Sequence, residues 1–252
     1  MKVTIVLTVY NREQYLPAAI ESFLTQTYTQ TELLIWDDGS TDKSLTIAQN
    51  YASQNPHIQV IPAVHRGRIT ALYAAMEMAN GTYIGWLDSD DLLRPTAIEE
   101  TVAILDKHPS IGMVYTDYWV INEQGTIQGL GNRCLIPYSQ KRLLVDFMTF
   151  HFRLFRQAVY VAAGKLDQSM TYAQDYDLCL KLSEITEIYH LKSALYLYRN
   201  HNNSISNQQK PAQIRCSYRA ISNALARRNM NKTRSLELVP GPQFIFSKKA
   251  FE

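Results

Sequence analysis

Apolar and polar residues are arranged at the start of the chain so that strands and a helix are predicted in alternation. Residues 3–9 and 32–36 are mostly apolar or β-branched, which is typical of strands buried on both faces of a parallel sheet. Between them, apolar residues recur at helical spacing over residues 15–25, and Pro17 suits a first helical turn. The pattern therefore predicts a largely buried β-α-β unit.

The alternation continues beyond this unit. A helix is predicted through Tyr51, a short strand over 58–61, a helix over 70–79 and an apolar strand over 82–87, after which Pro95 prevents the strand from continuing. The order β-α-β-α-β-α-β favours a parallel, right-handed, Rossmann-like sheet. We therefore expect an α/β domain.

Polar side chains follow three of the predicted strands at the point where each strand ends. They are Thr8, Tyr10 and Arg12 after the first strand, Asp37 and Asp38 after the second, and Asp88 and Asp90 after the fourth. Because the carboxyl ends of parallel strands share one edge of the sheet, where ligands bind, we expect one cleft that holds a nucleotide. No G-x-G-x-x-G and no G-x-x-x-x-G-K-[ST] sequence is present, which argues against a dinucleotide dehydrogenase and a P-loop NTPase.

Three acidic residues lie within four positions at the end of the fourth strand. Asp88, Asp90 and Asp91 repel one another, so they stay ionised at low cost only beside a cation or several hydrogen-bond donors. Oxygen ligands at a strand end suit Mg²⁺ or Mn²⁺ that carries a substrate phosphate. The alternative is a solvated acidic turn that caps the next helix, because Asp favours turns and N-caps.

Composition narrows the choice of partner and compartment only slightly. The chain has 252 residues, of which 46% are apolar and 19% charged, and a net charge of +2, so bulk charge does not favour a nucleic-acid partner. Three cysteines without C-x-x-C spacing argue against a disulfide framework. No apolar run reaches the ~18–20 residues of a membrane span, and residues 3–9 are too short for a signal sequence. We expect a cytoplasmic protein, and peripheral contact with the inner face of a membrane stays open.

Four segments, in this order, resemble the glycosyltransferases of family 2, which have the GT-A fold. They are Thr8-Val9-Tyr10-Asn11 with Tyr15-Leu16, then residues 22–28, then Asp37-Asp38-Gly39-Ser40-Thr41-Asp42, and then Asp88-Ser89-Asp90-Asp91. Segments at 163–167, 173–182 and 198–206 are similar to later motifs of the family. The resemblance implies an α/β fold with a Rossmann-like, mainly parallel sheet flanked by helices.

The resemblance covers about the first 205 residues, and the rest of the chain is interpreted from its own sequence. Residues 1–205 would form one GT-A domain, with a nucleotide-binding half at 1–100 and an acceptor half at 101–205. Residues 206–252 would form a C-terminal helical annex and tail, in which 210–228 is helical and basic. Helix packing explains these basic residues, and docking on anionic lipid is the alternative.

The resemblance places the nucleotide at the strand ends. The nucleotide-binding residues that it implies are Thr8, Tyr10, Arg12, Asp38, Arg68, Asp88 and Ser89. Thr8 and Asp38 would contact the uracil of UDP, since a carboxylate can accept from the uracil N3–H; for Asp38 the alternative is an Asx turn. Arg68 or Arg66 would replace an arginine that members carry where this chain has Ala71-Leu72-Tyr73.

A divalent cation, Mn²⁺ or Mg²⁺, is implied as well. Asp90 would bind it directly, Asp88 would lie near the ribose or a metal-bound water, and His201 would be a further ligand. Such an ion bridges the two phosphates and neutralises the leaving nucleoside diphosphate. The alternative for His201 is a surface or capping residue. Asp91 is expected to cap the following helix or to hold its loop.

Asp175 matches the catalytic base of the family. In an inverting displacement, one carboxylate removes the proton of the acceptor hydroxyl as this group attacks the anomeric carbon opposite UDP. The glutamate that usually precedes this aspartate is Gln174 here, and the alternative role for Asp175 is the N-cap of its helix. Trp119 with its neighbour Tyr118, and His151, are the candidate acceptor contacts, with a place in the core as the alternative.

Together these features predict an inverting, metal-dependent glycosyltransferase. It would move a sugar from a UDP-sugar to a hydroxyl of a saccharide or lipid-linked saccharide, in polysaccharide or glycoconjugate synthesis. One alternative is a sugar nucleotidyltransferase, but the glycine-rich basic loop expected after its first strand is missing from residues 8–15. The other is a saccharide-binding domain that keeps the fold without turnover. The presence of Asp88, Asp90 and Asp175 argues against a domain that has lost its catalytic activity.

Overall fold

Nine strands form one sheet in the part of the chain that the structure describes. The structure is a computed structural model, and it describes residues 1–201, 209–231, 234–239 and 243–248. The strand order is β3-β2-β1-β4-β8-β6-β9-β5, and β7 pairs with β6. The strands are β1 (Val3–Val9), β2 (Thr31–Asp37), β3 (Ile58–Pro62), β4 (Tyr83–Trp86), β5 (Leu92–Leu93), β6 (Ile111–Ile121), β7 (Ile127–Leu130), β8 (Arg153–Arg156) and β9 (Glu187–Arg199).

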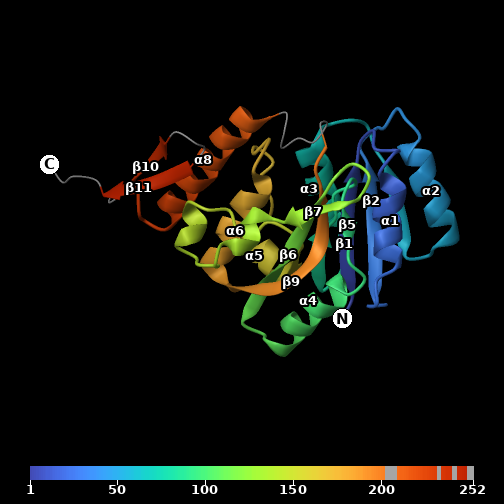
Figure 1. Cartoon of the computed structure of the whole chain (residues 1–252), viewed down its shortest axis with the longest axis horizontal. Coiled ribbons are helices and arrows are strands. Elements are labelled where there is room, and N and C mark those ends of the chain that lie inside the picture. Colours follow the sequence, from blue (N-terminus) through green and yellow to red (C-terminus); the bar gives the residue numbers. More distant parts are fainter. Residues whose placement is uncertain (202–208, 232–233, 240–242, 249–252) are drawn as a thin grey trace.

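Helices separate the strands and pack around the sheet (Figure 1). The α-helices are α1 (Leu16–Leu24), α2 (Ser44–Gln54), α3 (Arg68–Met78), α4 (Ala97–Lys107), α5 (Gln157–Ala162), α6 (Gln174–Ile185) and α8 (Lys210–Arg227), and the 3₁₀ helices are η1 (Asn132–Leu135) and η2 (Arg142–Leu144). The alternation of strands and helices predicted for the first 90 residues is confirmed. The helix predicted over 70–79 begins two residues earlier, at Arg68.

The first four predicted strands form a parallel sheet, as their apolar sequences predict. β1 pairs in parallel with β2 and β4, and β2 pairs in parallel with β3. Ile5 and Leu7 of β1 lie in the same apolar cluster as Ile20 of α1, whereas Val6 lies in the cluster that contains Leu72 of α3. Both faces of β1 are therefore buried, which explains why its sequence shows no polar alternation.

The second half of the sheet is mixed. β8 lies between β4 and β6 and runs antiparallel to both, β6 and β9 pair in parallel, and β5 pairs antiparallel with β9. Because β8 runs against β4, its first residue, Arg153, and the preceding His151 lie at the edge where β4 ends. The end of β9 reaches this edge beside β5. The mixed half therefore brings additional residues to the strand ends of the parallel half.

The described C-terminal part consists of a helix and a hairpin. α8 packs against α6, and its residues Ile221 and Leu225 are buried in the same apolar cluster as Leu182. β10 (Arg234–Val239) and β11 (Gln243–Lys248) pair antiparallel, which the sequence pattern did not predict. The proposed boundary at residue 205 stays a prediction, because residues 202–208 lie outside the described part.

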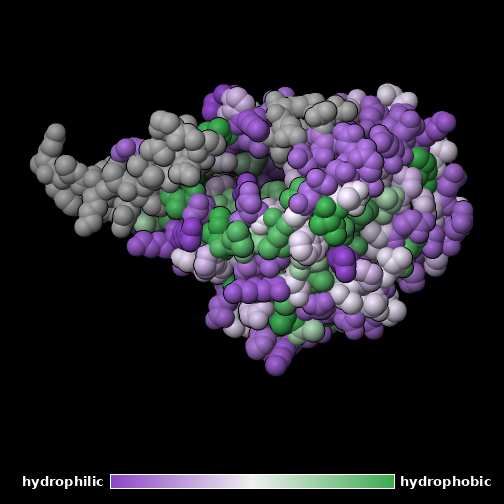
Figure 2. Space-filling view, viewed as in Figure 1, coloured by the Kyte–Doolittle hydropathy of each residue, from purple (hydrophilic) through white to green (hydrophobic). Residues whose placement is uncertain are grey.

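The surface is mixed in character. Hydrophilic residues cover most of the side formed by α1 and α2, and apolar residues are more frequent towards the middle of the face shown in Figure 2. Among the described residues, none of the helices has the length and the apolar character needed to cross a membrane.

Candidate functional site

Arg68 and Asp88 form an ion pair at the centre of the strand-end edge. Arg68 is the first residue of α3, and its Nη2 atom lies 2.5 Å from Oδ1 of Asp88. Asp88 is the main cause that raises the pKa of Arg68 above its ordinary value, and Asp175 and Asp90 raise it further. Arg68 therefore lies within electrostatic reach of three carboxylates that were predicted to serve different roles.

The two predicted metal ligands, Asp90 and His201, lie side by side. Nε2 of His201 is 3.0 Å from Oδ2 of Asp90, and Nε of Arg12 is 3.6 Å from the same oxygen. The His201 side chain is buried, whereas Asp90 keeps 20% of its side chain exposed. A carboxylate oxygen beside an imidazole nitrogen is a donor set that suits Mn²⁺ and related divalent ions. These two residues therefore fit the predicted cation.

Asp91 holds its loop against the end of β9, as the sequence predicts. Its Oδ2 atom accepts a hydrogen bond from the Tyr196 hydroxyl at 2.8 Å, and its Oδ1 atom accepts one from the backbone N–H of Arg199 at 2.6 Å. The Arg199 side chain donates in turn to the backbone oxygen of Asp90 at 2.8 Å. These contacts join residues more than one hundred positions apart and fix the backbone of the loop that carries Asp90.

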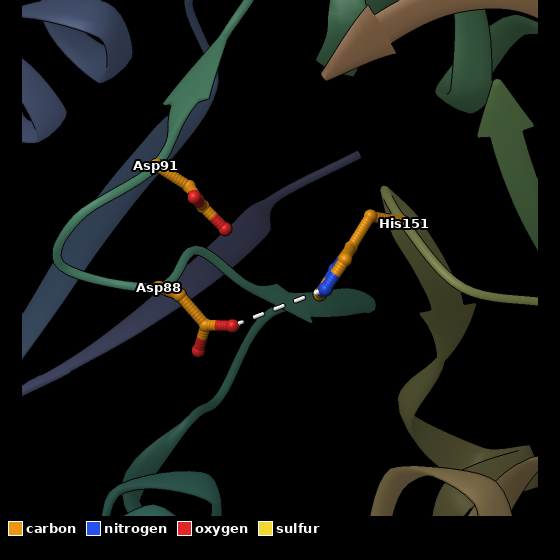
Figure 3. A group of neighbouring side chains, drawn as sticks. All are labelled: Asp88, Asp91 and His151. Carbon is orange, nitrogen blue, oxygen red and sulfur yellow. Dashed lines mark ion pairs between the residues drawn. The ribbon is translucent and has the colours of Figure 1, made fainter. Parts of the chain in front are cut away.

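Asp88, Asp91 and His151 form a second group of possible cation ligands (Figure 3). One ligand atom from each lies within 4.8 Å of the others, and Nε2 of His151 is 4.0 Å from Oδ2 of Asp88. Burial lowers the pKa of His151 well below its ordinary value, and its ring stacks on Tyr196 at 4.6 Å. Both oxygens of Asp91 already accept hydrogen bonds, so a cation bound by this group would have to replace one of them.

Asp38 holds the loop that leads into α3. Its Oδ1 and Oδ2 atoms accept hydrogen bonds from the backbone N–H groups of Arg66 and Gly67, each at 2.9 Å. The Asx turn considered for Asp38 is not formed among the described residues, because the backbone N–H of Ser40 donates to Oδ1 of Asp37 at 3.0 Å. Asp38 is also buried. Its carboxylate fixes the loop through these two hydrogen bonds. Its contact with uracil stays a prediction.

The remaining predicted nucleotide residues lie at the ends of β1 and β4. Tyr10 is 40% exposed, and its ring stacks on His65 at 4.0 Å between centroids. Thr8 is half-buried near the end of β1, and Ser89 is buried just after β4. The exposed ring of Tyr10 gives this edge an aromatic surface on which a base can stack.

Asp175 lies in the first turn of α6 and forms an ion pair with a buried arginine. Its Oδ2 atom is 3.4 Å from Nη1 of Arg153, and the same nitrogen donates to the backbone oxygen of Thr149 at 2.9 Å. The Arg153 guanidinium also lies over the Trp86 ring, 4.7 Å from its centroid. The N-cap position of α6 belongs to Ala173, so N-capping does not explain Asp175.

A cavity of about 560 Å³ opens beside Asp175. Its aromatic lining consists of Tyr118, Phe147, Phe150, Tyr172, Tyr176 and Tyr198. Arg68 lines the cavity as well and so connects it to the acidic end of β4. Tyr118, and not Trp119, belongs to this lining; Trp119 is half-buried where β6 pairs with β7. Aromatic walls beside a carboxylate suit a sugar ring whose hydroxyl is to lose a proton.

Sequence reasoning missed Arg153 and the role of Arg199. Arg153 is 2% exposed on its side chain, and the only signal that marks it is an arginine at the start of the short segment Arg-Leu-Phe-Arg. Arg199 holds the acidic loop through its backbone N–H, which donates to Asp91, and its side chain, which donates to the backbone oxygen of Asp90. Both residues act through partners that the sheet topology brings to them.

Solved structures of other proteins share the fold of this chain. The solved structure of S. aureus TarS in complex with UDP-GlcNAc superposes with a TM-score of 0.74 at 18% identity, covering 89% of this chain and 66% of that one. The mannosyltransferase PcManGT from Pyrobaculum calidifontis, in complex with GDP-Man and Mn²⁺, gives a TM-score of 0.63 at 16% identity, covering 90% of this chain and 64% of that one. The predicted GT-A fold is thereby confirmed.

Sequence comparison identifies the family. Chondroitin synthase from Escherichia coli is 32% identical over 230 residues, which are 91% of this chain and 33% of that protein. The chain spans about a quarter to a third of the length of the first curated relatives that it matches. The family description "Glycosyl transferase family 2" matches residues 4–162, which is more than half of the chain. The chain therefore belongs to glycosyl transferase family 2.

Proposed function

We propose that this chain transfers a sugar from a UDP-sugar to a hydroxyl group of a saccharide or lipid-linked saccharide, with inversion and with a divalent cation. The main support is the position of Arg68, which lies between the acidic end of β4 and Asp175 and lines the cavity beside them. A relative named chondroitin synthase and a fold shared with TarS bound to UDP-GlcNAc support saccharide synthesis from a UDP-sugar.

The donor end carries the charges that a nucleoside diphosphate requires. Arg12 and Arg68 supply positive charge beside Asp90 and Asp88. Asp90 and His201 would hold Mn²⁺ or Mg²⁺, which supplies charge stabilisation for the departing UDP. The stacked ring of Tyr10 offers a platform for the uracil at the same edge. The arginines orient the diphosphate so that its bond to the sugar faces the cavity.

The acceptor end carries one general base. Asp175 takes the proton from the acceptor hydroxyl while the hydroxyl oxygen forms a bond to the anomeric carbon on the face opposite UDP. The bond between this carbon and the UDP oxygen breaks, and the electron pair leaves with UDP, so the anomeric configuration inverts. Arg153 keeps the Asp175 carboxylate oriented, because its own position is held by Thr149 and Trp86.

The experiment that tests the donor end is a calorimetric titration of UDP with and without Mn²⁺. We expect UDP to bind more tightly with Mn²⁺ and Asp90→Ala to lose this difference, by about 100-fold or more, since even outer-shell partners of a metal contribute about 10- to 100-fold. Asp106→Ala is the matched control, because Asp106 contacts Tyr83 away from this edge. Binding that is indifferent to Mn²⁺ and to Asp90→Ala would refute the cation site.

A further inference from the structure

Two cationic side chains of the cavity are used neither by the donor end nor by the base. They are Arg133 of η1 and Lys210 at the start of α8, and both line the cavity. Within the described ranges, no Asp or Glu oxygen lies within 4.0 Å of either cation. Residues 202–208, which precede α8, contain no Asp or Glu in their sequence. Among the described residues, the two positive charges therefore have no acidic partner within 4.0 Å.

The acids that line the cavity are already paired. Asp146 forms an ion pair with Arg142 at 2.7 Å, and Asp175 forms its pair with Arg153 at 3.4 Å. The third cation of the lining, Arg68, is neutralised by Asp88. The balance of charge in the cavity is therefore positive, which favours a ligand that brings a negative charge.

The Arg133 side chain is held in place for binding. Its guanidinium lies over the rings of Phe147 and Phe150, 5.1 Å and 4.6 Å from their centroids. Nη1 donates to the backbone oxygen of Phe147 at 2.6 Å, and in the described part of the chain the other guanidinium nitrogens have no acceptor. A planar guanidinium with free N–H groups matches the two oxygens of a carboxylate, sulfate or phosphate. Fixing it in advance lowers the entropy cost of binding.

We propose that the acceptor saccharide carries a negatively charged group and that Arg133, assisted by Lys210, binds this group. The inference rests on the proposed function and specifies its substrate class. The shared chemistry is an oxyanion on a sugar ring, whose source is a carboxylate, a sulfate or a phosphate. The aromatic rings around Arg133 contact the sugar, and Asp175 faces its reacting hydroxyl from the same cavity.

The test measures binding of matched methyl glycosides to the full chain in the presence of UDP and Mn²⁺. The probes are gluco- and galacto-configured, each as the neutral sugar, the 6-carboxylate, the 6-sulfate and the 6-phosphate. We expect one charged form to bind about 10- to 100-fold more tightly than its neutral counterpart, the size expected of charge-assisted hydrogen bonds. The form that gains most identifies the charged group, and the gain should shrink with added salt.

Variants assign the gain to Arg133. Arg133→Met should abolish it, and Arg133→Lys should keep part of it, because lysine preserves the charge but not the planar fork. Arg219→Met is the matched control, since Arg219 lies on α8 outside the lining and donates to Ser169; it should keep the full gain. If Arg133→Met does not fold, Arg133→Lys and the salt dependence decide the question.

Three outcomes would overturn the inference. They are equal binding of charged and neutral glycosides, binding of none of them, and a gain that survives in Arg133→Met. Titration of UDP on the same samples distinguishes a failure of this inference from a failure of the proposed function. If UDP binds with Mn²⁺ dependence while the glycosides show no preference for charge, the donor site stands and only the charged acceptor is refuted.

Discussion

Asp88, which follows β4, and Asp175, on α6, each form an ion pair with an arginine. The two pairs differ in how much of the arginine is exposed. Asp88, Asp90 and Asp91 are crowded within four positions, and the partner of Asp88, Arg68, keeps 38% of its side chain exposed. Asp175 stands alone, and its partner Arg153 is 2% exposed. The Arg68 side chain is thus partly exposed, whereas the Arg153 side chain is buried.

This difference follows from what each pair is proposed to contact. An exposed arginine can exchange its carboxylate partner for an incoming diphosphate, because little packing holds it in one place. A buried arginine is held by its packing, and separating it from its partner would leave a buried charge unpaired. We therefore expect Arg153 to keep Asp175 in one orientation. The proposed donor end is therefore adaptable, whereas the proposed base is held in one orientation, as the proposed proton transfer requires.

The largest expected effect comes from Asp175→Asn. We expect the rate of transfer to fall by about 10³-fold, since a positioned general base contributes about 10² to 10⁴-fold, while the affinity for UDP stays the same. Asp146→Asn is the matched control, because Asp146 lines the same cavity but is paired with Arg142. A rate within a few-fold of wild type would show that another group removes the proton.

The two arginines should differ in their effect on stability. Arg153→Met removes one partner of a buried pair, and we expect it to lower the free energy of unfolding by about 3 kcal/mol, the low end of the usual range because Asp175 is 22% exposed. Arg68→Met should change it by less than about 1 kcal/mol and weaken UDP binding instead. Urea unfolding with UDP titration separates the two. Equal losses of stability would remove the distinction between the pairs.

The sequence predicts the residues around Asp88 and Asp90 far better than the surroundings of Asp175. Continuous apolar runs mark the parallel strands, and the shared edge of such strands places Arg12, Asp88 and Asp90 together without any knowledge of the structure. The pairing of Asp90 with His201 was anticipated only through the resemblance to the family, because 111 positions separate them.

The surroundings of Asp175 depend on the mixed half of the sheet. The antiparallel placement of β8 between β4 and β6 brings Arg153 to Asp175, and no local pattern in residues 151–156 specifies that neighbour. The same placement buries His151 beside Asp88. A strand of 4 residues such as β8 is too short to indicate its partners, so both contacts had to come from the structure.

The smallest expected effect comes from crowding at the donor end. Burial raises the pKa of Asp91 well above its ordinary value of 3.8, and the charges of Asp90 and Asp88 raise it further. A carboxyl group whose pKa is raised by folding binds its proton more tightly in the folded state. Its contribution to stability is therefore fully present below the unfolded pKa and is lost as the pH rises through the folded pKa.

Asp91→Asn removes this proton exchange and keeps an oxygen to accept from the backbone N–H of Arg199. We expect the free energy of unfolding of wild type, relative to this variant, to fall as the pH rises above about 4, by at most about 1.4 kcal/mol per pH unit. Urea unfolding of both proteins in metal-free buffer measures the difference at each pH. A difference for Asp91→Asn that is constant with pH would mean that its neighbours do not crowd it, and the contrast between the two ends would then rest on their arginines alone.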